Sequence, residues 1–480
     1  MAGGWLNSSI LPGFLQQGSG LGIEPDLAVA RCYLLNVCLK STAATVSDSR
    51  PTRFRWRIVV LLMAAAAINY LDRSCMGMAA PKIQEEFGLS TTQIGYVIGV
   101  FQYGYLLSYL GSGVLVDRLG ARWGYVLIMA AWSAVGALTA IGSRLWHFLL
   151  CRFSLGVAEA GCWPSSNKVV AQWFPRVERP LACGLFDSGS ALAQVFGPPV
   201  LAAIILHWGW RTSFIAAGSL GFVWILVWLR MFHTPEEHPS VNAAELAAIR
   251  HEPDASRQEG VETDAGSVPW KRLLRCRQVW GIFVLNAATS PLWFVLYNWL
   301  PKYFYDARGV RFDKLGWYSA LPMVGSAIGG TLGSTILVRL LRRPGMTATV
   351  ARRRMFLLDV TIMAALIPAV RCQNVLHSAL YMALVAFGLG LHSANVLSSV
   401  SDFVPARLVA TVTGLQASGT FLYSLPIATF AGWVVERFGY SPLFVFAALH
   451  PWLAIVSANL IIRKFEPISG ISTRLAAQQP

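Results

Sequence analysis

Long apolar runs recur along almost the whole chain, and each is close to the length that a helix needs to cross a bilayer. Such a helix needs about 20 mostly apolar residues, because the hydrocarbon core is ~30 Å thick. Of the 480 residues, 55% are hydrophobic and 13% are charged, which leaves too few polar side chains to cover a water-soluble globule of this size. The sequence therefore predicts an all-α membrane protein with about twelve transmembrane helices.

A charged stretch bounded by prolines separates the predicted helices into two groups of about six. We expect this stretch, 233–276, to be a central cytoplasmic loop between bundles at 53–232 and 277–465. Residues 1–52 and 466–480 are predicted to be cytoplasmic tails, and the first to be disordered; a misassigned translation start is the alternative for most of it. The predicted helices occupy 56–80, 93–116, 123–142, 145–170, 181–206, 211–232, 277–301, 315–341, 355–370, 375–403, 408–435 and 440–463.

The basic residues separate apolar runs instead of gathering on one surface. Most of the 39 Lys and Arg fall in the tails, the central loop and alternate short loops. Loops rich in Lys and Arg stay in the cytoplasm, so this distribution predicts a multi-pass protein of the cell membrane (inner or plasma) with both termini cytoplasmic. The net charge of +15 does not form a basic patch with interleaved aromatics, and no nucleic-acid partner is expected.

Residues that could support covalent chemistry or metal binding do not form recognisable motifs. The eight cysteines include no C-x-x-C pair and no Cys/His ligand set, so neither a disulfide framework nor a zinc site is predicted. The chain also lacks H-E-x-x-H and G-x-S-x-G motifs, and its tails and central loop are too small for the output domain of a sensor. We therefore expect no enzyme, no cofactor and no metal.

An unpaired charge inside a membrane span costs several kcal/mol, so ionisable residues there are candidates for function. Those inside the predicted spans and away from helix ends are Asp72, Arg73, Arg152, Glu159 and Asp187, with Lys168 and Asp359 as further candidates. Arg152 and Glu159 are seven residues apart and share one helix face, about 10 Å apart along the axis. Asp72 and Arg73 are adjacent and point roughly 100° apart. We predict that Arg73 receives a substrate carboxylate in a fork geometry, and that Asp72 and Glu159 carry protons under the influence of Arg152. The alternative is a structural ion pair between Arg152 and Glu159.

Other polar or aromatic side chains in the predicted spans are candidate contacts to a substrate, although an aromatic residue in a membrane helix is more often a packing residue. A lone His392 is more often a satisfied interior histidine than a proton relay. The candidate contacts are Tyr70, Tyr105, Ser190, Trp293, Tyr297, Asn298, Ser393, Asn395, Gln416 and Tyr423.

Asp187 and the charged residues around 117–122 raise two further expectations. Asp187 adds an acid near the expected anion path, where it would repel a dianion unless it is protonated or paired, and Lys168 is a candidate partner. Asp117, Arg118 and Arg122 form a charged loop that we expect to act in conformational gating through salt bridges at helix ends. Topology determination by the two arginines is compatible with that role.

Several separated motifs resemble those of one transporter family, and the match extends over both halves. The segment Gly113–Arg122 resembles the loop signature of the major facilitator superfamily, while Asn69–Arg73 and Arg152–Ala160 resemble its anion:cation symporter branch, which includes hexuronate, aldarate and galactonate transporters. This resemblance implies two six-helix bundles with the substrate held between them. In that family the acids matching Asp72 and Glu159 couple proton movement, and the arginine matching Arg73 binds the anion.

These observations together predict a secondary active transporter that imports a small organic anion by proton symport with alternating access. A sugar acid or another carboxylate is the expected substrate, protons and the lipid bilayer are the other expected partners, and the protein is expected to be a monomer. Two alternatives remain open: an organic anion exchanger or uniporter without proton coupling, and transport of an aromatic or other monocarboxylate.

Overall fold

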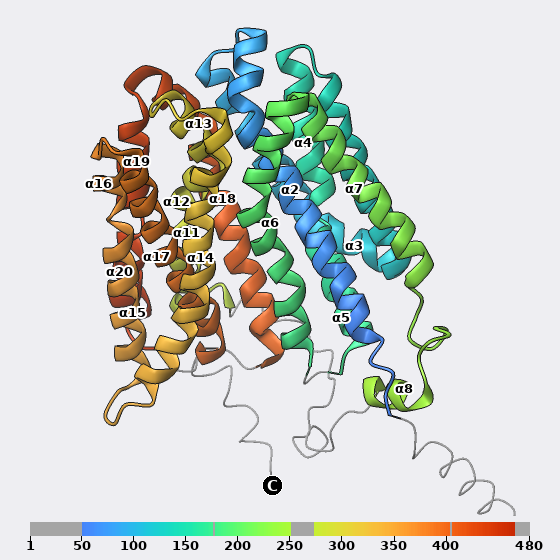
Figure 1. Ribbon diagram of the computed structural model, residues 1–480. Helices are drawn as coiled ribbons and strands as arrows, with labels where there is room; N and C mark the ends of the chain where they lie inside the picture. The colour runs from blue at the N-terminus through green and yellow to red at the C-terminus, as the bar shows by residue number, and fades with distance from the viewer. Residues whose placement is uncertain (1–49, 176–177, 251–272, 404–405, 466–480) are drawn as a thin grey trace, which may run out of the picture. The chain divides into compact units, whose positions relative to one another are not determined.

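The computed structural model describes residues 50–175, 178–250, 273–403 and 406–465, and within these ranges it is helical without strands (Figure 1). A small unit combines 50–53 with Pro239–Arg250 and contains helix α8 (Ala243–Arg250), where the Asn242 amide donates to the Arg50 carbonyl. All other described residues belong to one large unit. Most of the predicted tails and central loop lies outside the described residues.

The first half of the large unit contains six passes. A positive φ of 76° at Gly120 breaks α3 into two passes, because this backbone conformation favours glycine and cannot continue a right-handed helix. The passes are α2 (Arg55–Phe87), the two parts of α3 (Thr91–Leu138), α4 (Leu145–Glu159) followed by α5 (Cys162–Trp173), α6 (Arg179–Trp208) and α7 (Trp210–Met231).

The second half also contains six passes, and three of them are interrupted. Pro291 and Pro301 each open a new helical segment, since proline lacks the N–H that would continue the hydrogen-bond ladder. The passes are α11 (Arg277–Ala287), α12 (Ser290–Phe294), a π-helical turn η2 (Val295–Trp299) and α13 (Leu300–Asp306); α14 (Phe312–Leu341); α15 (Ala348–Met363) with α16 (Leu366–Arg371); α17 (Val375–Phe403); α18 (Ala406–Phe438); and α19 (Tyr440–Leu449) with α20 (Trp452–Val456) and the π-helical turn η3 (Ser457–Ile462).

Eight helical stretches of the described chain are long and apolar enough to cross a membrane by themselves. The first part of α3, the divided passes α4–α5 and α15–α16, and the more polar α18 complete two sets of six. The expected all-α architecture of about twelve transmembrane helices is thereby confirmed.

The two halves touch closely at one end of the large unit, where α3 packs on α18, α6 on α14 and α2 on α13. Glycines permit this approach: a Cβ on Gly95 would lie 2.6 Å from Gly432 Cα, and one on Gly99 would lie 2.1 Å from the Ala428 carbonyl oxygen. The Thr92 backbone N–H also donates to Glu436 over 2.7 Å. This end, which is uppermost in Figure 1, is closed between the halves.

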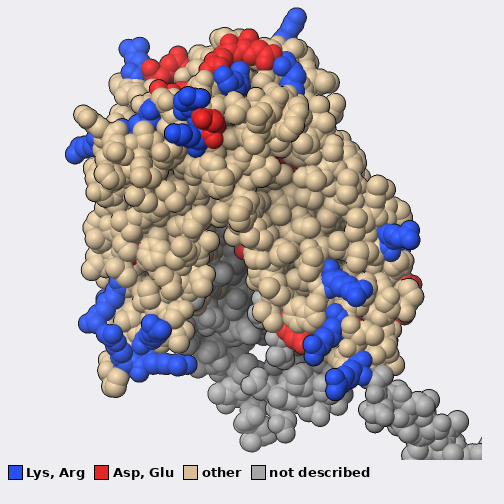
Figure 2. Space-filling view, in the orientation of Figure 1, with Lys and Arg blue, Asp and Glu red and all other residues tan. Residues whose placement is uncertain are grey.

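At the opposite end the surface is hollowed between the two halves (Figure 2). Lys and Arg predominate at this hollowed end, whereas the closed end carries both acidic and basic side chains. The hollowed end includes the turn at Gly120 and the turn between α14 and α15. By the positive-inside rule we expect it to face the cytoplasm.

Replacing Gly99 with Leu is expected to keep the closed end from closing, because no side chain fits against the Ala428 carbonyl oxygen. Spin labels at Arg144 and Gln373, exposed on loops of the two halves at this end, should report a longer distance by double electron–electron resonance. Gly111→Leu is the matched control, since a Cβ there meets open space. An unchanged distance in Gly99→Leu would mean that this contact does not limit closure.

Candidate functional site

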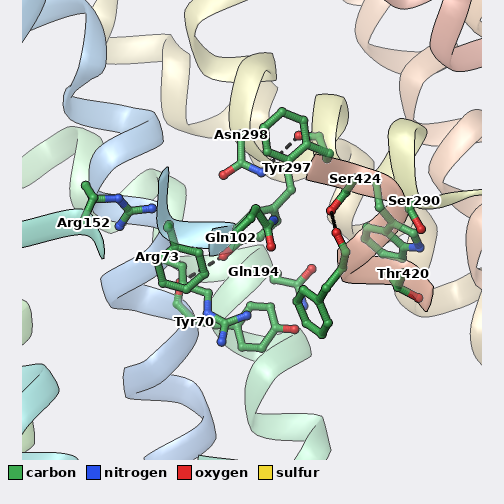
Figure 3. A pocket seen from close by; sticks show the side chains of 14 residues that line it. Tyr70, Arg73, Gln102, Arg152, Gln194, Ser290, Tyr297, Asn298, Thr420 and Ser424 are labelled. Carbon is green, nitrogen blue, oxygen red and sulfur yellow. Dashed lines mark hydrogen bonds between the residues drawn. The ribbon is translucent and has the colours of Figure 1, made fainter. Parts of the chain in front are cut away.

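A cavity of about 230 Å³ lies between the halves and is lined by both (Figure 3). It is smaller than the roughly 300–1,000 Å³ typical of pockets for drug-sized ligands, and so suits a small molecule. Helices α2, α3, α4 and α6 contribute from the first half, and α12, η2 and α18 from the second. Its polar or ring-bearing lining residues are Tyr70, Arg73, Phe101, Gln102, Arg152, Gln194, Ser290, Trp293, Phe294, Tyr297, Asn298, Thr420, Phe421 and Ser424.

Two arginines supply the positive charge of the cavity. Arg73 Nε donates to Glu159 Oε2 over 2.6 Å, and the Glu159 side chain behind it is fully buried. Arg73 Nη2 and Arg152 Nε and Nη1 are buried and have no acceptor among the described residues. Since an unpaired buried donor costs free energy, these N–H groups are suited to an anionic ligand.

Aromatic rings hold the two guanidinium groups in the cavity wall. The Arg73 guanidinium carbon lies 5.1 Å from the ring centroids of Tyr70 and Phe101 and 4.9 Å from that of Tyr105. The Arg152 guanidinium carbon lies 4.8 Å from the centroid of Phe101, so one ring serves both cations. These contacts are within the range of cation–π attraction and position the guanidinium groups without using their N–H donors.

Asp72 and Arg73 point in different directions, as adjacent helical residues should. Arg73 lines the cavity, whereas Asp72 is 2% exposed and is not part of the lining. A Cβ on Gly136 would lie 3.4 Å from Asp72 Oδ1, which places the carboxyl group against the second pass of α3 inside the first half. The structure thus brings Arg73, Arg152 and Glu159 together and sets Asp72 behind them.

The other predicted contacts divide between the cavity and positions behind it. Tyr70, Trp293 and Asn298 line the cavity, while Tyr105 stacks on Phe421 with ring centroids 4.7 Å apart. The structure does not bring Ser190, Asn395 or Gln416 to the lining. The Ser190 hydroxyl donates to the Asp187 carbonyl oxygen, the Asn395 side chain accepts from Arg352, and Gln416 is buried.

Several lining residues were not predicted: Gln102, Gln194, Ser290, Thr420 and Ser424. The signal for Ser290 was present, because it lies three residues before Trp293 and seven before Tyr297, two predicted lining residues, and shares one helix face with them. Tyr297 also bridges the halves, since its hydroxyl donates to the Tyr70 carbonyl oxygen over 3.1 Å.

At the hollowed end, the expected pair between Lys168 and Asp187 is not found among the described contacts. Lys168, the candidate partner of Asp187, instead pairs with Asp117 over 2.9 Å and donates to the Val116 carbonyl oxygen. The lysine lies on α5, which packs against α3, and its amino group reaches the end of the first pass of α3. Arg122 donates to the carbonyl oxygen of Leu229 on α7 over 2.8 Å, and Arg118 is exposed. The gating role of this loop stays a prediction.

His392 belongs to a second buried polar cluster, inside the second half. Its Nε2 lies 2.9 Å from the Leu285 carbonyl oxygen and its Nδ1 lies 3.2 Å from Asp359 Oδ2. Because a carbonyl oxygen only accepts, Nε2 carries a proton. Both ring nitrogens are therefore satisfied, as expected of an interior histidine.

Replacing Phe101 with Leu is expected to weaken binding of a carboxylate ligand by about 5- to 30-fold, because two cation–π contacts of ~0.5–1 kcal/mol each are lost. Isothermal titration calorimetry on the purified protein measures the change, and a thermal melt checks that folding survives. Phe101→Tyr keeps the ring and should retain affinity. Equal affinity in the Leu and Tyr variants would show that the ring does not position the arginines.

Comparison with known proteins agrees with this geometry. Residues 62–428 match the family model described as Major Facilitator Superfamily. The chain is 27% identical to a D-galactonate transporter of Escherichia coli O6:H1, covering 87% of this chain and 97% of that one. It is 28% identical to the probable galactarate/D-glucarate transporter GudP of Bacillus subtilis, covering 92% and 98%.

Among solved structures, a bacterial homolog of the human lysosomal transporter Spinster, in an inward-facing and occupied conformation, superposes with a TM-score of 0.69. The alignment covers 87% of this chain and 98% of that one at 17% identity, which supports the fold alone. The family model covers most of the chain and both halves of the large unit. The chain therefore belongs to the Major Facilitator Superfamily, a family of multi-pass membrane transporters and not of enzymes.

Proposed function

We propose that the protein imports a small organic anion, a sugar acid or a related carboxylate, across the cell membrane by proton symport with alternating access. The observation that carries this proposal is the pair Arg73 and Arg152, whose buried N–H groups face one cavity without an acceptor among the described residues. Relatives named as galactonate and galactarate/glucarate transporters support the same class of substrate.

The substrate carboxylate binds at the Arg73 guanidinium, which stays charged at every relevant pH and matches a carboxylate in a fork geometry. Arg152 provides a second cation on the same wall. Amide and hydroxyl groups, such as those of Gln102, Gln194 and Asn298, are suited to the hydroxyls of a sugar chain. Because these groups come from both halves, bound substrate links the two bundles.

Proton coupling follows from competition for Arg73. In the structure the Glu159 carboxyl group occupies one donor edge of that guanidinium. A substrate carboxylate arriving at the same cation weakens the attraction that keeps Glu159 ionised, which favours uptake of a proton by Glu159. Asp72, whose Oδ2 has no partner among the described residues, is the second proton carrier. Arg152 adds a second positive charge to the cluster formed by Asp72, Glu159 and Arg73.

In the proposed cycle the closed end and the hollowed end exchange roles. Rocking of the two halves would open the contacts at Gly95 and Gly99 and close the hollow, so that the cavity faces each side of the membrane in turn. With the hollowed end in the cytoplasm, this structure corresponds to the state that releases substrate inside. The charged loop at Asp117, Arg118 and Arg122 lies where such rocking would break and remake contacts.

An anion exchanger or uniporter without protons is the second candidate. A purely structural ion pair between Glu159 and Arg73 would favour this candidate, because Glu159 would then carry no proton during transport. The two candidates differ in one measurement: an inward proton gradient drives accumulation by a symporter and leaves an exchanger or uniporter unaffected.

Arg73→Ala is expected to abolish uptake, because the anion would then have to enter a low-dielectric cavity without its main cation. Arg73→Lys keeps the charge but loses the fork, so its affinity should fall about tenfold or more. Uptake of labelled D-galactonate or D-galacturonate into proteoliposomes measures both variants. The control is Arg57→Ala, an exposed arginine on the same helix, and full uptake by Arg73→Ala would contradict the assignment.

Glu159→Gln is expected to lose accumulation driven by a proton gradient and to keep exchange of labelled for unlabelled substrate. The amide oxygen still accepts from Arg73, but the side chain no longer takes up a proton. The two activities are measured on the same proteoliposomes, with Glu237→Gln, an exposed acid, as the control. Concentrative uptake surviving in Glu159→Gln would refute the coupling role.

A further inference from the structure

Charge is distributed unevenly across the cavity. Both cations, Arg73 and Arg152, belong to the first half, as Figure 3 shows on one side of the view. On the second-half wall, the described lining residues offer hydroxyl, amide, phenol and indole groups and no Lys, Arg or His. Arg352, a buried basic side chain of that half, is directed to Asn395 and Ser398.

An acid lies between the cavity and the hollowed end. Asp187 precedes the lining residue Gln194 by seven residues on α6, so both project from one face and lie about 10 Å apart along the axis. Its side chain is exposed and interacts electrostatically with Tyr70, another lining residue. Among the described residues no salt bridge to Asp187 is found. Lys168, the expected partner, pairs with Asp117 instead.

From these two observations we infer that the site selects a polyhydroxy acid with one carboxylate and discriminates against an acid with a carboxylate at each end. This inference rests on the proposed function and specifies its substrate class. The single carboxylate binds at the arginines, and the hydroxylated end meets the neutral wall formed by residues such as Ser290, Asn298 and Ser424.

A second carboxylate has no favourable place in this arrangement. Directed toward the second half, it would exchange its hydration for neutral hydrogen-bond donors alone, which does not offset the desolvation of a full charge. Directed toward the hollowed end, it would approach the Asp187 carboxylate, and like charges repel most strongly where water is partly excluded. Both orientations disfavour the dianion.

The test uses compounds that share one carbon skeleton and differ in the number of carboxylates: D-galactose, D-galactonate and galactarate, with D-glucose, D-gluconate and D-glucarate as a second series. Competition against a labelled monoacid on the purified full chain in proteoliposomes gives the relative affinities at pH 7. We expect one of the monoacids to bind and its matching diacid to bind at least about tenfold more weakly, with no binding of the neutral sugars.

Equal or tighter binding of the diacid would overturn the inference and leave the proposed sugar-acid transport standing. Binding of no acid in either series would refute the proposed function and this inference with it. The two failures are therefore distinguishable in one experiment.

Two variants test the electrostatic cause. Asp187→Asn removes the acid on the path, and Asn298→Lys places a cation on the second-half wall; each should narrow the preference for the monoacid over the diacid by about threefold or more. Asn298→Leu is the uncharged control for the lysine and should not narrow it. If the wild-type preference is present and neither charge-changing variant reduces it, the charge distribution is not its cause and the inference fails.

Discussion

The ion pair between Arg73 and Glu159 is the interaction on which the site depends. A guanidinium held in a membrane protein needs counter-charge, hydrogen-bond acceptors or aromatic contact, and this one has a buried carboxylate on one edge and three rings around it. One carboxylate cannot satisfy all the donors of a guanidinium, and Arg152 adds more. The excess of donors over acceptors among the described residues suits the cavity to an anionic ligand.

The two halves contribute differently to the same cavity. The first half supplies the charges, both at the lining and behind it, whereas the second supplies neutral polar groups and aromatic surface. The second half pairs its own buried charges away from the cavity lining, Asp359 with His392 and Arg352 with Asn395. In the proposed mechanism, recognition of charge belongs to the first half and recognition of shape to the second.

The fold was predictable from the sequence because each pass through lipid has to be a long apolar helix. Arg73 and Glu159 could also be identified as candidate site residues from the sequence, because charged residues are rare inside an apolar span. The neutral lining was not: Gln194 and Thr420 face the cavity and Asn395 does not, although all three are ordinary polar residues in apolar helices. Which of them faces the cavity depends on the rotation of each pass about its axis, and that rotation is set by packing between passes that are distant in the sequence. The partner of Lys168 could not be assigned for the same reason.

The π-helical turn at Val295–Trp299 adds a property to the neutral wall. Such a turn accommodates one residue more than an α-helical turn, and it sits between the segments opened by Pro291 and Pro301. The extra residue offsets the side chains that follow it by about 100° relative to an uninterrupted α-helix. Tyr297 and Asn298 lie within this turn, so it sets the angle at which the neutral wall presents their side chains to the cavity.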